Sequence, residues 1–128
     1  MAPEISLLVW SVALCLVQVV IAACGTVLQI GLPTAAGNRA DMPPFAGWVG
    51  RAHRAHRNML ESLVLFGALV LAVVATASSN ATTVLGAQLF FWCRLAYAVI
   101  YLAGIPWLRT LAWAVSIAGL VMMLTQVI

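Results

Sequence analysis

The chain has 128 residues, of which 65% are apolar and 7% are charged. Soluble globular chains are about 25% charged, and a chain this short cannot bury so much apolar surface by folding alone. The composition therefore excludes a soluble domain and predicts one all-α integral membrane domain over residues 1–128. The net charge of +3 gives no indication of nucleic-acid binding.

The first predicted transmembrane span is the apolar run over residues 5–30. A bilayer core about 30 Å thick requires roughly 20 helical residues, so this run is long enough to cross it with a tilt. A signal peptide is not expected, because the N-terminus lacks a basic region and carries Glu4 instead. Residues 38–44 are polar and rich in proline, which predicts a loop.

The second predicted helix begins near Pro43 or Pro44, since proline is tolerated in a first helical turn. Its basic start, residues 44–58, is expected to stand outside the hydrocarbon, and its apolar remainder is expected to cross it. Further breaks at residues 78–80 and 104–106 divide the rest of the chain into two more spans. The four predicted spans cover residues 5–30, 59–77, 83–103 and 107–127.

The basic residues predict how these four transmembrane helices are oriented. With four spans, the loops after the first and the third lie on one side, and that side carries every arginine except Arg94, namely Arg39, Arg51, Arg54, Arg57 and Arg109. The positive-inside rule makes that side cytoplasmic and puts both termini on the opposite side. The compactness of the chain suggests a bacterial inner membrane.

A polar stripe marks the point where the second helix enters the membrane. At 100° per residue, Arg51, Arg54, Asn58 and Glu61 fall within about 80° of one another. Guanidinium, amide and carboxylate groups together suit a small zwitterionic or anionic ligand. The alternative is an anchor for anionic lipid headgroups, which accounts for the arginines but not for Asn58 and Glu61.

A second polar group lies on the third span, where Arg94, Tyr97 and Tyr101 share one helix face. Arg94 is expected about 14 Å inside the membrane, and an unpaired guanidinium there is costly. Glu61 is predicted as its partner, because it is the only acidic residue expected near the membrane on that side. Such an ion pair can be purely structural, or it can be part of a binding site.

Arg109 is the third candidate, at the start of the fourth span. A cation can stabilise a thiolate by lowering the pKa of a thiol, and the alternative is another membrane-surface anchor. His53 and His56 have a spacing that suits a metal, but no third ligand accompanies them, so no metal site is predicted.

These motifs resemble those of the family of membrane-associated proteins in eicosanoid and glutathione metabolism (MAPEG). The family's second-helix signature, Arg-Ala-x-x-Asn-x-x-Glu, is matched from Arg54 to Glu61. Its third-helix pattern, Arg-x-x-Tyr-x-x-x-Tyr, is matched by Arg94, Tyr97 and Tyr101, and Arg109 follows where the fourth helix begins. The resemblance covers nearly the whole chain.

The resemblance implies a homotrimer that binds glutathione between neighbouring subunits at the cytoplasmic side. Glutathione would be held by residues of the second and third helices, and a lipophilic electrophile would arrive from the bilayer. By resemblance, Arg109 would face the sulfur as the catalytic residue. The implied glutathione-binding residues are Arg51, Arg54, His56, Asn58, Glu61, Arg94, Tyr97 and Tyr101.

Three functions remain open at this point. The first is a glutathione-dependent transferase or peroxidase, which Arg109 and both tyrosines favour. The second is a non-catalytic member that binds lipid or serves as a scaffold. It is favoured because residues 28–31 lack the basic residue that several enzymes of the family carry there. The third is a four-span multidrug transporter, which is disfavoured because Glu4 lies at the extreme N-terminus rather than deep in the first helix.

Overall fold

The computed structural model describes residues 2–31 and 47–128. These residues form four α-helices and no strands, and each helix is long and apolar enough to cross a membrane. The predicted all-α membrane fold is therefore confirmed. Arg39 and the helix start expected at Pro43 or Pro44 lie outside the described residues. The helices are α1 (Pro3–Ile30), α3 (Gly47–Ala75), α4 (Ala81–Ala103) and α5 (Pro106–Val127).

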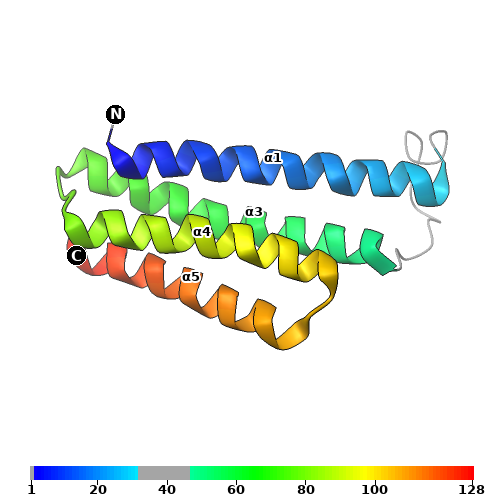
Figure 1. Ribbon diagram of the computed structural model, residues 1–128. Coiled ribbons are helices and arrows are strands. Elements are labelled where there is room, and N and C mark those ends of the chain that lie inside the picture. The colour runs from blue at the N-terminus through cyan, green and yellow to red at the C-terminus, as the bar shows by residue number, and fades with distance from the viewer. Residues whose placement is uncertain (1, 32–46) are drawn as a thin grey trace.

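The four helices lie side by side in an up-and-down bundle, with both termini at the same end (Figure 1). Helices α3 and α4 form its middle, because α1 contacts α3 and α4 while α5 contacts α4 and α3. The end opposite the termini holds the start of α3, the α4–α5 turn and the described arginines near them, and we call it the basic end. Toward this end α5 diverges from its neighbours (Figure 1).

The helix ends follow from local sequence. Proline occupies the first turn of α1 and of α5, where its missing N–H costs no hydrogen bond. Asn80 caps α4 by accepting a hydrogen bond from the Thr83 amide, and the Thr83 hydroxyl accepts one from the Asn80 amide in return. Gly104 ends α4 in the left-handed conformation, at φ 80°, which favours glycine.

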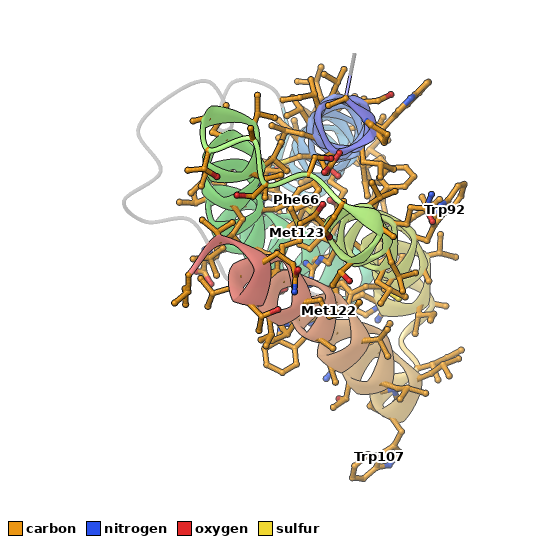
Figure 2. The ribbon with its side chains drawn as sticks, turned by 90° about the vertical axis from the view of Figure 1, so that its left-hand side faces the viewer. Phe66, Trp92, Trp107, Met122 and Met123 are labelled. Carbon is orange, nitrogen blue, oxygen red and sulfur yellow. The ribbon has the colours of Figure 1, made fainter. Side chains whose placement is uncertain are left out.

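An apolar core fills the interior of the bundle. The rings of Phe66 and Phe90 stack with centroids 4.2 Å apart. Seen along the bundle, Phe66 and Met123 point toward the centre, while Trp92 and Trp107 point outward (Figure 2). Much of the outer surface is also apolar, which suits helices that pack by shape within lipid rather than by escape from water.

At the end that carries the termini, hydrogen bonds between polar side chains join α1, α4 and α5. Glu4 is fully buried, and its Oε2 accepts hydrogen bonds from the hydroxyls of Ser79 (2.6 Å) and Thr83 (2.8 Å). Asn80 donates from its side chain to Gln126 on α5 at 2.9 Å. These bonds tie the start of α1 and the end of α5 to the α3–α4 turn.

The backbones of α4 and α5 approach each other closely at two glycines. A Cβ atom added to Gly86 would lie 2.6 Å from the carbonyl oxygen of Gly119, and one added to Gly119 would lie 2.5 Å from that of Gly86. Both distances are too short for real contacts. Small residues at such a crossing let two backbones meet in a membrane, where dispersion contacts stabilise the pair.

We predict that Gly86→Ala destabilises the protein by about 1–3 kcal/mol, because the added methyl meets rigid backbone and forces α4 away from α5. Thermal unfolding in detergent measures the loss. Gly67→Ala is the matched control, since a Cβ there meets only the Cδ1 of Leu8 at 3.8 Å. Equal stability of the two variants would contradict the proposed helix contact.

Candidate functional site

The centre of the candidate site is Arg94, which is 1% exposed in the middle of α4. Its Nη2 donates a hydrogen bond of 2.7 Å to Oδ1 of Asn58 on α3, and its guanidinium lies 4.2 Å from the ring centroid of Tyr97. Its Nε and Nη1 are buried and have no hydrogen-bond partner among the described residues. A buried cation with this little compensation is costly inside a membrane, which makes the position a candidate for a functional site.

Tyr101, one helical turn nearer the basic end than Tyr97, contacts two more guanidinium groups. Arg54 donates from Nε to the Tyr101 hydroxyl at 3.1 Å. Arg109 lies over the Tyr101 ring, 4.6 Å from its centroid, and the rings of Tyr97 and Tyr101 are 5.4 Å apart. Aromatic faces attract cations, so the tyrosines hold the guanidinium groups in place without neutralising their charge.

A recess opens beside this cluster, between α3, α4 and α5. It is lined by Asn58, Tyr97, Arg109, Thr110 and Trp113. It lies toward the basic end, where α5 diverges from the other helices (Figure 1). The recess is therefore the point at which a polar ligand at the membrane surface can reach the residues that surround Arg94.

The lining of the recess is rich in hydrogen-bond donors. Because a guanidinium group can only donate, the Asn58 atom bonded to Arg94 must be the carbonyl oxygen, which leaves the Asn58 amino group free to donate. Arg109 and Trp113 can only donate, while the Tyr97 and Thr110 hydroxyls can donate as well as accept. No carboxylate lines the recess. This arrangement is complementary to an anion.

The predicted Arg94–Glu61 ion pair is wrong for the described chain. Glu61 is exposed, and the partner of Arg94 is Asn58. Both residues belong to the predicted polar stripe. Because Glu61 comes three positions after Asn58, its side chain lies about 60° further around α3 from the buried face of the helix than that of Asn58. The sequence identified the stripe without indicating which of its edges faces α4.

Other predicted ligand residues are held elsewhere. Arg51 donates from Nε to the carbonyl oxygen of Leu102 at 3.1 Å, so it binds the end of α4. His56 is partly buried and does not line the recess. His53, by contrast, connects two helices, since its Nε2 lies 2.7 Å from the hydroxyl of Thr26 on α1. The structure thus brings together Arg54, Asn58, Arg94, Tyr97, Tyr101 and Arg109.

Thr110 and Trp113 are lining residues that the sequence did not single out. They lie one and four positions after Arg109, on the same side of α5, so helical spacing from Arg109 is the signal that could have found them. Trp113 is an ordinary residue for an apolar span, and its place in the lining of the recess depends on the position of α3 opposite it.

Comparison with known sequences identifies one family. The sequence model of the MAPEG family matches residues 7–128, which is nearly the whole chain and includes every residue that lines the recess. No curated protein and no solved structure matches the chain at a significant level.

We predict that Asn58→Ala destabilises the protein by about 1–3 kcal/mol, because it removes the hydrogen-bond acceptor of a buried guanidinium. Asn58→Asp keeps an acceptor there and should be far less damaging. Glu61→Ala changes an exposed side chain and should unfold with the parent chain. Thermal unfolding in detergent compares the stability of the three variants. If Glu61→Ala loses as much stability as Asn58→Ala, then Arg94 and Glu61 form an ion pair in the assembled protein.

Proposed function

The chain belongs to the MAPEG family of membrane proteins in eicosanoid and glutathione metabolism, and we propose that it binds glutathione in the recess between α3, α4 and α5. Glutathione carries two carboxylates, one ammonium group and one thiol. The observation that carries the proposal is the donor-rich lining beside three clustered guanidinium groups, with no acidic side chain in the lining. Such a site is suited to an anionic ligand.

Each group of glutathione has a suitable counterpart near the recess. The amino group of Asn58 and the guanidinium of Arg54 are suited to the carboxylates. Glu61 is exposed one helical turn beyond Asn58, at a position where it can meet the ammonium group. Arg109 both lines the recess and lies over Tyr101, so it is suited to the sulfur. Arg51 and His56 would act at the margin of the site.

The proposed reaction begins with the thiol. A thiol is a poor nucleophile until it loses its proton, and a nearby cation favours the thiolate. With Arg109 beside the sulfur, the proton passes to water and the thiolate remains bound. The sulfur electron pair then forms a bond to an electrophilic carbon of a lipophilic substrate, and the bonding electrons of the carbon–leaving group bond go to the leaving group. This chemistry corresponds to a glutathione transferase, or to a peroxidase when the electrophile is a peroxide oxygen.

The bundle geometry suits this division between a polar and an apolar substrate. The arginines of α3 and α5 gather at one end of the bundle, which the positive-inside rule makes cytoplasmic, where glutathione is dissolved. The lipophilic partner reaches the recess from the surrounding bilayer. The recess is open on its outer side, and in the homotrimer that the family implies, a neighbouring subunit would cover it.

A second candidate function is a non-catalytic lipid-binding or scaffold protein on the same fold. The last turn of α1 has no basic residue, whereas several enzymes of the family carry one there. Arg109 also already contacts Tyr101, and this contact competes with an approach to sulfur. In this alternative the donor-rich recess binds an anionic lipid headgroup in place of glutathione.

We predict that glutathione added to the detergent-purified protein near neutral pH produces a saturable thiolate band in the ultraviolet difference spectrum. Arg109→Ala should retain glutathione binding by calorimetry but lose the band, because the cation beside the sulfur is gone. The control is Arg57→Ala, an exposed arginine outside the recess, which should keep both signals.

Absence of both the band and calorimetric binding in the parent protein would reject the glutathione site and favour the lipid-binding alternative. Binding without a band would keep the site and reject the catalytic role. An unchanged band in Arg109→Ala would remove Arg109 from the chemistry.

A further inference from the structure

Gln18 on α1 and Arg94 on α4 are both buried, and each has polar atoms without a hydrogen-bond partner among the described residues. Gln18 is 7% exposed, and its unpaired atom is the acceptor Oε1. The unpaired atoms of Arg94 are the donors Nε and Nη1. Buried polar groups without a partner are rare in folded proteins. An unpaired acceptor on one helix and unpaired donors on another are complementary if the two side chains meet.

The two side chains reach the same depth in the bundle. Near the termini, Oε2 of Glu4 on α1 accepts a hydrogen bond of 2.8 Å from the hydroxyl of Thr83 on α4, and the two helices run in the same direction from there (Figure 1). Gln18 comes 14 residues after Glu4, which is about 21 Å further along α1. Tyr97 comes the same 14 residues after Thr83. The Arg94 guanidinium is 4.2 Å from the centroid of the Tyr97 ring and therefore lies at the depth of Gln18.

The two side chains also point toward the same space. At 100° per residue, Gln18 lies about 40° around α1 from Glu4, and Arg94 lies about 20° around α4 from Thr83. Because Glu4 and Thr83 are in contact, Gln18 and Arg94 project between α1 and α4 as that pair does. Gln18 also lines a groove together with Ala98, which is one helical turn after Arg94. The part of α4 next to Gln18 is therefore the part that carries Arg94.

A water molecule is the ligand that suits the space between these two groups. Buried waters commonly bind polar groups that otherwise have no partner, and they require at least two such groups. A water accepts a hydrogen bond from a guanidinium N–H and donates one to an amide oxygen, which are the two functions left unused on Arg94 and Gln18. The bilayer at this depth supplies no water, so such a molecule has to be held by the protein itself.

We propose that one buried water molecule joins Oε1 of Gln18 to the guanidinium of Arg94, and that Gln18 is a positioning residue for Arg94. The guanidinium is then held from two sides, by α1 through the water and by Asn58 on α3 through the direct hydrogen bond of 2.7 Å. Asn58 lines the recess and Gln18 does not, so α1 supports the recess from behind. This water site does not depend on whether the recess binds glutathione.

The first test detects the water by nuclear magnetic resonance of the full chain, labelled with ¹⁵N-arginine, in detergent. The Arg94 side-chain signals are those that persist in single Arg→Lys variants of the other five arginines. In the parent protein these N–H protons should show cross-relaxation with water in the rotating frame, where its sign differs from that of chemical exchange. In Gln18→Leu the cross-relaxation should be lost and the Arg94 signals should shift. Its absence from the parent protein, or unchanged Arg94 signals in Gln18→Leu, would overturn the proposal.

The second test asks whether an oxygen acceptor at position 18 is sufficient. Gln18→Leu should lower the unfolding temperature in detergent by about 5 °C, because a buried charged donor loses its partner. Gln18→Glu keeps an oxygen acceptor and should recover most of that loss. Gln88→Leu is the matched control, since it makes the same change at an exposed glutamine of α4, and it should leave the Arg94 signals in place. If Gln18→Glu is as unstable as Gln18→Leu, or if Gln88→Leu shifts the Arg94 signals equally, the positioning role is wrong.

Discussion

The hydrogen bond between Arg94 and Asn58 is the interaction on which the polar site depends. It fixes a cation in the membrane-embedded part of the bundle and joins α4 to α3 at the depth where the recess begins. It also sets the orientation of the Asn58 amide, so that a donor rather than an acceptor remains for a ligand. Tyr97 supports the same guanidinium through its ring and lines the recess as well. The buried cation and the binding surface are therefore parts of one arrangement.

Packing elsewhere in the bundle keeps this arrangement in register. The close approach of Gly86 and Gly119 joins α4 to α5 in the half of the bundle that carries the termini. Toward the basic end α5 diverges from the other helices (Figure 1). There the Arg109 guanidinium lies over the ring of Tyr101 beside the recess. The tight contact at one end thus permits an opening at the other. Beside that opening, Arg51 donates a hydrogen bond to the Leu102 carbonyl oxygen in the last turn of α4.

Sequence reasoning predicted the fold class and most of the cluster for physical reasons that operate locally. Apolar length predicts membrane helices, and the spacing of Arg94, Tyr97 and Tyr101 puts them on one face whatever lies opposite. Sequence reasoning failed where a contact depends on the position of a neighbouring helix. Glu61 and Asn58 share a stripe, and only the position of α4 decides which of them meets Arg94. Gly86 and Gly119, likewise, are ordinary residues until their backbones are seen to touch.

The central claim is that the donor-rich recess, rather than the basic surface in general, receives glutathione. The most direct measurement is ¹⁵N nuclear magnetic resonance of arginine side chains in the labelled protein, assigned by single Arg→Lys variants. On titration with glutathione, the Nε–H signal of Arg109 should shift to saturation, because Arg109 lines the recess. The signal of Arg57, which is exposed and outside the recess, should stay in place. A saturable shift confined to Arg57, or no shift at Arg109, would contradict the account.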